Sequence, residues 1–170
     1  MQSVQQIAVG TDNTNRIGRK ITIKSVEYDY TFAATQSDLG TTASYSEMMD
    51  GLRLSLVWDR QPAGGGTIPS YSDIYASAPN AQTAPLSKRN MDNIDCFVVL
   101  ATNMDTISYA GPNTTQGHRF IKTNLGSRYD GTNANDISTG QLLLCWIDQN
   151  INGANNAQLN VSCRVKFTDD

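Results

Sequence analysis

The alternation that decides the fold is clearest in Leu159-Asn160-Val161-Ser162-Cys163-Arg164-Val165-Lys166-Phe167. Its odd-numbered residues are apolar and its even-numbered residues are polar or charged. A period of two places the apolar side chains on one face of a β-strand. We therefore predict a strand whose odd-numbered residues face a core and whose even-numbered residues face out.

The same period recurs near the start of the chain, with one interruption. Ile21 and Ile23 alternate with polar residues, and the apolar residues of the next stretch are Val26, Tyr28, Tyr30 and Phe32. The parity shifts by one residue, which is the effect of a β-bulge near residues 24–26. We predict one long, bent strand over residues 19–33.

Further segments have strand patterns of other kinds. Leu52, Leu54, Leu56 and Trp58 alternate with polar residues, whereas residues 96–101 and 142–147 are apolar at consecutive positions and predict strands covered on both faces. A weaker strand is expected over residues 118–125, and residues 106–109 either continue the strand at 96–101 or pair with it. Loops are predicted at 126–136 and over the long connection 68–89, where residues 72–76 favour a helical turn.

Composition and length agree with an all-β chain. The 170 residues suit one domain, and only 17% of them are charged. Long loops between antiparallel strands favour a Greek-key sandwich over an up-and-down barrel. We predict an eight-stranded antiparallel single jelly-roll sandwich over residues 19–168, preceded by an N-terminal arm at 1–18 and followed by a tail at 169–170.

Few residues suit an active site. His118 is the single histidine, so any Ser-His-Asp triad must use it, and a cupin-type metal centre needs more than one. It follows a turn-like sequence, and we expect it to be solvated or packed in a loop. Cys96, Cys145 and Cys163 lie in apolar runs and predict reduced, buried thiols. We expect no enzyme, no cofactor and no metal site, although carboxylates far apart in the sequence could still meet at a cleft.

The sequence gives no sign of a membrane partner. No run approaches the roughly 18 apolar residues that span a bilayer. The first six residues have neither the basic nor the apolar region of a signal peptide. We expect neither a leader nor a membrane span.

Positive charge gathers near the two ends of the chain, although the formal net charge is −3. If the first and last strands pair antiparallel, cations of both meet on one outer face and attract phosphates. The alternative is a charged, solvated face that prevents sheets from stacking. The candidate nucleic-acid-binding residues are Arg16, Arg19, Lys20, Lys24, Arg164 and Lys166.

The proline-containing connection over residues 68–89 carries apolar and tyrosine side chains beyond what one core requires. Such residues are typical of an obligate subunit interface. The alternative is that the connection folds over the subunit's own core. The candidate interface residues are Ile68, Tyr71, Ile74, Tyr75 and Leu86.

Several segments resemble a family. GTDNTNRIGRKITIK at residues 10–24 resembles the segment leading into the first strand in capsid proteins of circular, Rep-encoding single-stranded DNA viruses. LRLSLVWDRQP at 52–62 and the YSDIY turn at 71–75 are similar to their second strand and its exit. GQLLLCW at 140–146 and LNVSCRVKF at 159–167 are similar to the final strands of geminivirus capsids. The strand order also resembles that of small satellite plant virus coat proteins.

The resemblance implies a capsid-type jelly roll that self-assembles into a small, T=1-like icosahedral shell around a single-stranded, circular DNA genome. It also implies a location in the virion and, during assembly, in the host nucleus. Family members usually carry an arginine-rich N-terminal arm, which is absent here; we expect that it has been removed. A lectin-like, carbohydrate-binding sandwich is the alternative, and it predicts Trp or Tyr at loop tips, whereas Trp58 and Trp146 lie in predicted strands.

Overall fold

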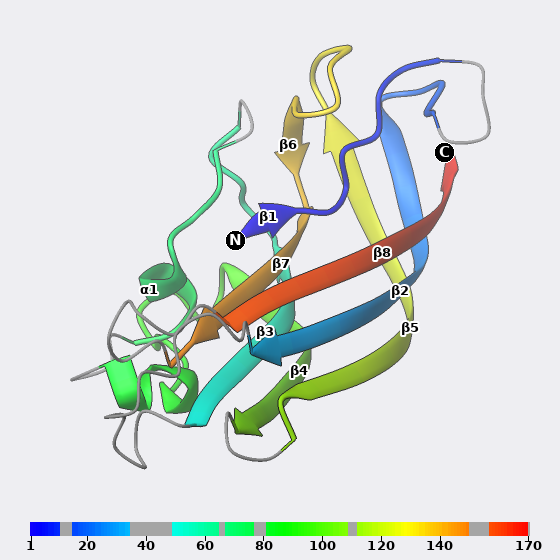
Figure 1. Cartoon of the computed structure of the whole chain (residues 1–170). Helices are drawn as coiled ribbons and strands as arrows, with labels where there is room; N and C mark the ends of the chain where they lie inside the picture. Colours follow the sequence, from blue (N-terminus) through cyan, green and yellow to red (C-terminus); the bar gives the residue numbers. More distant parts are fainter. Residues whose placement is uncertain are drawn as a thin grey trace.

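The computed structural model describes residues 1–10, 15–34, 49–64, 67–76, 81–108, 112–149 and 157–169. These residues form two four-stranded antiparallel sheets that pack face to face (Figure 1). The elements, in chain order, are β1 (Gln2–Ser3), β2 (Lys20–Ala34), β3 (Met49–Asp59), α1 (Tyr71–Ile74), the 3-10 helix η3 (Ala81–Leu86), β4 (Phe97–Ser108), β5 (Thr114–Tyr129), β6 (Ile137–Thr139), β7 (Gln141–Asp148) and β8 (Ala157–Asp169).

The strand order is β1-β7-β3-β4 in one sheet and β6-β5-β2-β8 in the other. Because most neighbours in a sheet are not consecutive in the chain, strands cross between the two sheets, as in a jelly roll. The prediction of an all-β, jelly-roll-like sandwich is confirmed. The predicted first and last long strands, β2 and β8, pair antiparallel along almost their whole length.

Strand β2 has the predicted bulge. Its register shifts between Ile23 and Ser25 against both of its neighbours, β5 and β8. The bulge lets the apolar residues on either side of it point into the same core, where Ile21, Ile23, Val26 and Tyr28 are fully buried. The parity change in the sequence therefore corresponds to a real irregularity in the ladder.

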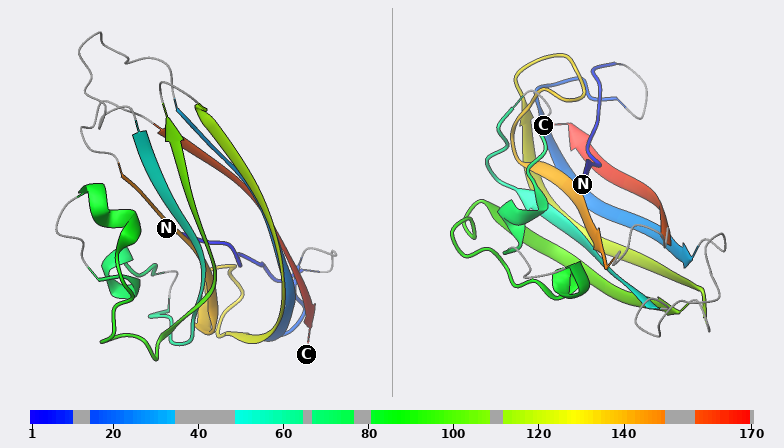
Figure 2. Two further views of the ribbon diagram at one scale, coloured as in Figure 1. Left: turned by 90° about the horizontal axis from the view of Figure 1, so that it is seen from below. Right: turned by 60° about the vertical axis from the view of Figure 1, so that its left-hand side comes forward.

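The outer face of the β1-β7-β3-β4 sheet is covered by the chain itself. The connection between β3 and β4, which includes α1, lies against this face (Figure 2). A second apolar cluster forms there from Val57, Ile74, Tyr75, Phe97, Leu143 and Cys145. This cover explains why residues 96–101 and 142–147 are apolar at consecutive positions.

The predicted helical turn in this connection is confirmed, one residue earlier than expected. Asp73 accepts a hydrogen bond from the Ser70 backbone N–H at 2.6 Å. The Asp73 backbone N–H donates to the Ser70 carbonyl at 3.2 Å. These bonds begin α1 at Tyr71 and direct Ile74 onto the sheet.

Residues 2–7 of the predicted N-terminal arm pack on the sandwich, so this part of the segment does not project from the domain. Gln2 and Ser3 pair with β7 as strand β1. The buried Gln5 side chain accepts a hydrogen bond from the Leu142 backbone N–H at 3.1 Å and donates to Tyr129. A polar side chain whose hydrogen bonds are satisfied can be buried, so the polar composition did not reveal this packing.

Three smaller predictions also change. β5 runs from Thr114 to Tyr129, so it includes residues 126–129, which were expected in a loop. Asp169, expected in a tail, is the last residue of β8. Cys145 is buried as predicted, but Cys96 is only half-buried and Cys163 is exposed.

Candidate nucleic-acid interface and subunit contacts

Cations of three strands meet on the face of the β6-β5-β2-β8 sheet that points away from the other sheet, called here the outer face. Directly opposite residues of antiparallel strands lie on the same face. Ser25 of β2 lies opposite Lys122 of β5 on one side and Lys166 of β8 on the other. The bulged Lys24 lies beside them, and its Nζ donates to Asn124 Oδ1 at 2.9 Å. All three lysines are exposed.

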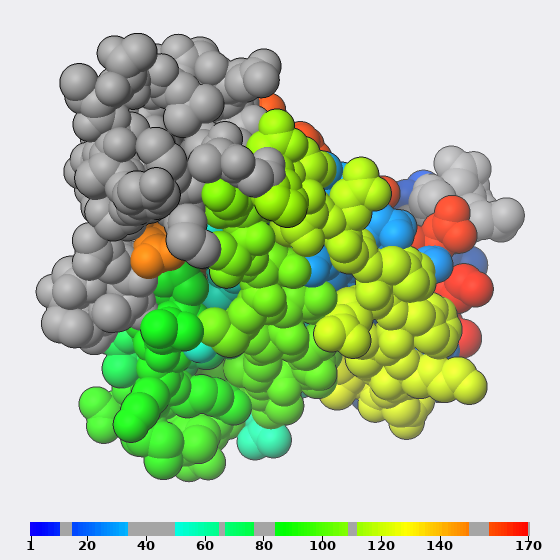
Figure 3. Space-filling view, turned by 60° about the horizontal axis from the view of Figure 1, so that its bottom comes forward, coloured from blue at the N-terminus to red at the C-terminus, as the bar shows by residue number. Residues whose placement is uncertain are grey.

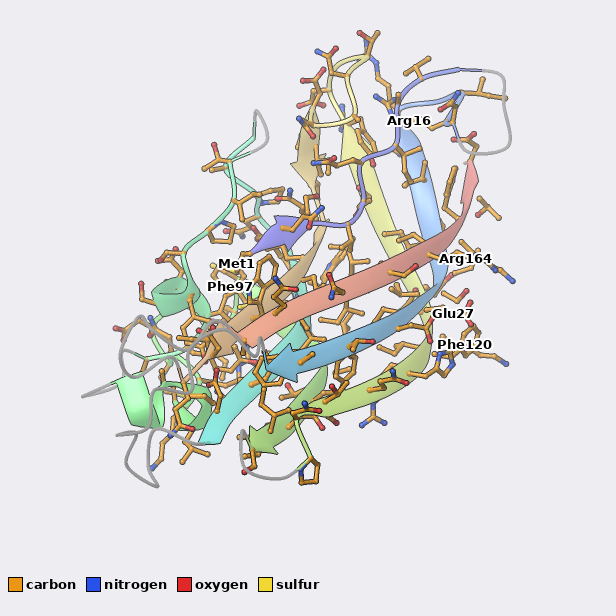
Figure 4. The ribbon with its side chains drawn as sticks, in the orientation of Figure 1. Met1, Arg16, Glu27, Phe97, Phe120 and Arg164 are labelled. Atoms are coloured by element: carbon orange, nitrogen blue, oxygen red, sulfur yellow. The ribbon has the colours of Figure 1, made fainter. Side chains whose placement is uncertain are left out.

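The aromatic ring of Phe120 also lies on this surface, at the level of Glu27, the next outward-facing residue of β2 after Ser25. Glu27 lies opposite Phe120 of β5 and Arg164 of β8. Figure 4 shows these three side chains together on the outer face. Phe120 is 51% exposed, which is unusual for a phenylalanine on a sheet that already packs on one side. The exposed ring therefore lies beside the Glu27 carboxylate, with Lys122 two residues further along β5 and Arg164 on the far side of Glu27.

Carboxylates occupy the centre of the outer face. Glu27 Oε2 lies 4.0 Å from Arg164 Nη1, and Asp29 Oδ1 lies 2.8 Å from His118 Nδ1. His118 lies in β5, as the strand predicted over residues 118–125 implies, and its side chain is 56% exposed, so it is solvated as expected. Exposed ion pairs of this kind contribute little to stability.

Arg16 does not belong to the outer face, and its prediction as a nucleic-acid contact is wrong. It is 1% exposed. Its guanidinium donates to the carbonyls of Ile7, Gly18 and Gly131 at 3.2, 2.7 and 2.7 Å and stacks 4.0 Å from the centroid of the Tyr129 ring. A guanidinium whose donors are taken by backbone carbonyls ties loops together instead of binding phosphate.

Among the other predicted contacts, Lys20, Lys24, Arg164 and Lys166 are exposed on β2 and β8, and Arg19 is exposed just before β2. Lys20 lies opposite Arg128 of β5. The sequence argument missed three members of this surface because it placed β5 only over residues 118–125 and gave it no partner. Those members are Phe120, Lys122 and Arg128.

The predicted subunit-contact residues divide into two groups. Ile74 and Tyr75 are 1% and 4% exposed, and Tyr71 stacks on Tyr75, so these three belong to the chain's own second cluster. The assignment of Ile74 and Tyr75 to a subunit interface is wrong, because both are buried within the chain, whereas that of Tyr71, which is half-buried, stays a prediction. Ile68 and Leu86 are exposed, and the same connection adds two exposed apolar residues that sequence reasoning missed, Met91 and Ile94.

The two long sides of the sandwich differ. Where β4 and β5 adjoin (Figure 3), Asn103 of β4 accepts a hydrogen bond from the Tyr28 hydroxyl at 2.9 Å and donates to the Tyr30 hydroxyl at 3.0 Å. We call this the closed side. On the opposite, open side, a hollow of about 380 Å³ lies between β8 and β7, lined by Phe32, Leu52, Leu144, Trp146, Leu159 and Val161 among others.

The described residues contain no group of three or more histidine, cysteine or acidic side chains placed to hold a metal ion. Within the same residues, no helix is long and apolar enough to cross a membrane. A comparison of the chain with protein-family models matches none of them, and a comparison with curated protein sequences finds no match either.

Proposed function

We propose that this chain is the structural subunit of a small viral shell, a capsid protein whose outer face contacts a single-stranded DNA genome. The observation that carries the proposal is the exposed Phe120 ring, which shares the outer face with Lys122 of β5 and with Arg164 and Lys166 of β8 and lies beside Glu27 of β2. Stacking platforms surrounded by positive charge bind single strands without reading their sequence. A shell protein needs such binding, because it packages a whole genome.

The charges of the outer face support a backbone contact. Lys24, Lys122 and Lys166 lie within one register step of each other and are exposed. Each lysine that neutralises a phosphate releases a condensed counterion, so binding weakens as salt rises. Glu27 and Asp29 limit this attraction, which favours moderate, reversible contact with nucleic acid.

Contact between subunits is supported by the connection between β3 and β4. Leu86 and Met91 are 65% and 68% exposed, and Ile68 and Ile94 are 39% exposed each. None of these four residues belongs to the second apolar cluster. Exposed apolar residues in one segment are typical of protein interfaces.

Assembly is tested by expressing the chain and recording size-exclusion chromatography and negative-stain electron microscopy. Uniform closed particles are expected. A chain that remains a compact monomer at all concentrations and salts contradicts the shell. The double variant Leu86→Ser, Met91→Ser is expected to remain folded and to lose particles, because both residues are exposed in the subunit.

Nucleic-acid binding is tested by fluorescence anisotropy with a labelled single-stranded oligonucleotide of mixed sequence. Phe120→Ala is expected to lower affinity about tenfold, the effect of losing roughly one stacked base. Lys20→Glu with Lys24→Glu is expected to lower both the affinity and the nucleic-acid content of particles. Arg60→Glu with Lys88→Glu, which makes the same total charge change on two exposed residues between β3 and β4, is the control. Equal effects of this control and the lysine reversals would contradict the role of the outer face.

A carbohydrate-binding sandwich is the second candidate, and one observation favours it. Trp146 is 36% exposed and lines the hollow of the open side, whereas Trp58 is buried. An exposed indole offers a flat apolar surface on which a sugar ring can stack. Titration of Trp146 fluorescence with oligosaccharides separates the two, since the shell proposal expects no saturable change.

A further inference from the structure

Strand β8 has one paired edge and one free edge. Within the described residues its hydrogen-bonded neighbour is β2 alone, and β8 is the terminal strand of its sheet (Figure 1). The free edge extends over the 13 residues of Ala157–Asp169. Alternate N–H and C=O groups point out of such an edge, which makes it a template for another strand. Proline, which would block pairing, is absent from β8.

The side chains beside this edge are incompletely covered. On β2, the inward-facing residues Tyr28, Tyr30 and Phe32 are at most 5% exposed. On β8, the residues directly opposite them are Cys163, Val161 and Leu159, of which the first is exposed and the other two are half-buried. These β8 residues would be buried if one further strand lay against β8.

The hollow lies at the same place. Leu159 and Val161 form its wall on β8, and Leu144 and Trp146 form its wall on β7. Its volume of about 380 Å³ corresponds to a few large apolar side chains. A strand added to β8 would direct every second side chain into this space.

We propose that the free edge of β8 binds one extended polypeptide strand of a partner, antiparallel to β8. Its inward residues are apolar and fill the hollow, and its outward residues include carboxylates opposite Arg164 and Lys166. Both cations are exposed on the outer face, and only Arg164 lies near a carboxylate, that of Glu27 at 4.0 Å. Opposite charges directly across a strand pair stabilise it. Binding by strand addition uses backbone bonds for affinity and side-chain pockets for selectivity.

A second copy of the chain fits this edge less well. Antiparallel pairing of two β8 strands about Cys163 would bring together residues of the same face, with Val161 opposite Val165. However, the same register places Arg164 opposite Ser162 and Lys166 opposite Asn160, so neither cation gains a carboxylate partner. The pair would instead gather four like charges on one face, which repel each other weakly. An acidic single strand removes this repulsion and also fills the hollow.

The inference does not depend on the proposed shell, because it concerns the isolated subunit. The probe is the synthetic peptide acetyl-TVEFEVEVT-amide, which alternates apolar residues with threonine or glutamate. Two control peptides carry the same residues in a shuffled order or lysine in place of each glutamate. Binding is measured on the full chain by hydrogen–deuterium exchange and by Trp146 fluorescence in a Trp58→Phe background, at concentrations where the chain is a single species.

The alternating acidic peptide is expected to bind one to one. It should slow the exchange of the β8 amides on the free edge at least about tenfold and shift Trp146 emission to shorter wavelength. Both control peptides are expected to bind at least about tenfold more weakly. Val161→Lys places a charge in the hollow and is expected to abolish binding. Ser162→Lys, its neighbour on the outer face, is the matched control and is expected to leave binding intact or strengthen it.

Four outcomes overturn the inference: free-edge β8 amides that are protected without peptide, equal effects of the two β8 variants, a response to oligosaccharides only, or concentration-dependent dimers with protected free-edge β8 amides. The last would assign the edge to a second copy. Particle formation is scored separately by microscopy. Particles without peptide binding contradict only the strand proposal, and peptide binding without particles contradicts only the shell.

Discussion

The closed and open sides of the sandwich differ in how the rim of the core is covered. On the closed side, the hydroxyls of Tyr28 and Tyr30 reach across from β2 to Asn103 of β4, and Arg119 of β5 donates to the same asparagine at 3.3 Å. The polar groups at this rim of the core thus form hydrogen bonds with each other. On the open side, the rim is a hollow between β8 and β7, where apolar side chains lie together with the polar residues Gln2, Asp148 and Asn160. The closed side is complete within one chain, whereas the open side has the form of an unfinished layer.

The comparison shows what a strand pattern can and cannot report. β2 and β8 have the same alternation, yet the inward side chains of β2 are buried and those of β8 are half-buried. The alternation of apolar and polar residues shows on which face of the sheet each side chain lies. Burial depends on how many strands lie beyond it, and that is a property of the sheet.

The largest difference between the sides is expected from a matched pair of leucines. Leu54 of β3 is fully buried, and Leu159 of β8 lines the hollow. Leu54→Ala is expected to lower the free energy of unfolding by about 2–5 kcal/mol, because it leaves a cavity in a packed core. Leu159→Ala is expected to cost about 1 kcal/mol, because much of its surface is already in water. Urea denaturation measures both, and equal costs would mean that the open side is packed like the core.

The next effect is a pH dependence beside the open side. Burial, together with the nearby Asp148 carboxylate, raises the pKa of Asp50 to about 6 from its ordinary 3.8. A raised carboxyl pKa means that the folded state resists ionisation, so the penalty is fully present above about pH 6 and vanishes below the unfolded-state pKa. The free energy of unfolding should therefore rise as pH falls from 7 to 5, by about 1 kcal/mol, which is part of a total of about 3 kcal/mol reached below pH 3.8.

The variant Asp50→Asn tests whether this pH dependence comes from the Asp50 carboxyl. Its amide oxygen can still accept the Gln149 N–H that Asp50 Oδ1 accepts at 3.0 Å. The variant is expected to be more stable at pH 7 and to lose most of the rise between pH 7 and 5. The control is Asp92→Asn, at an exposed position, which should leave the rise unchanged. A rise that persists in Asp50→Asn would assign the pH dependence to other groups.

A smaller effect concerns the hydrogen bonds of the closed side. Tyr28→Phe removes the hydroxyl that reaches Asn103 and is expected to cost about 1 kcal/mol, whereas Tyr30→Phe also removes a donor to the Asp105 carboxylate and is expected to cost about 2 kcal/mol. The double variant should cost less than the sum of the two, because both hydroxyls share one partner. Thermal unfolding followed by circular dichroism measures the three variants. Additive costs would show that the closed side is not one network.

Sequence reasoning recovered the parts of the fold that depend on local pattern. The bulge near Ile23, the strand over 159–167 and the helical turn before Ile74 all follow from the order of apolar and polar residues. It failed where burial depends on distant partners. Arg16 and Gln5 are polar, and only the loops and strands around them show that their hydrogen bonds are satisfied inside the protein.

The candidate interface shows the same limit. Lys24, Arg164 and Lys166 could be brought together because one assumption, that the first and last long strands pair, was enough. Phe120 and Lys122 needed the register of β5 as well. Their signal was present, since residues 118, 120 and 122 share a face of any strand, but a strand of unknown partner could not be placed beside β2.

The smallest effect on stability is expected at Glu27, where the outer face is most mixed. Glu27→Gln removes exposed ion pairs at 4.0 Å with Arg164 and His118, so the free energy of unfolding should change by less than about 0.5 kcal/mol. Affinity for a single-stranded oligonucleotide should nevertheless rise, because an anion beside Phe120 is lost. Asp130→Asn, which removes a similar exposed contact with Arg128 at 3.4 Å near the end of β5, is the control.

If the two variants raise affinity for the oligonucleotide equally, the change in net charge alone accounts for the gain. If Glu27→Gln raises it more, the centre of the outer face is where the strand lies.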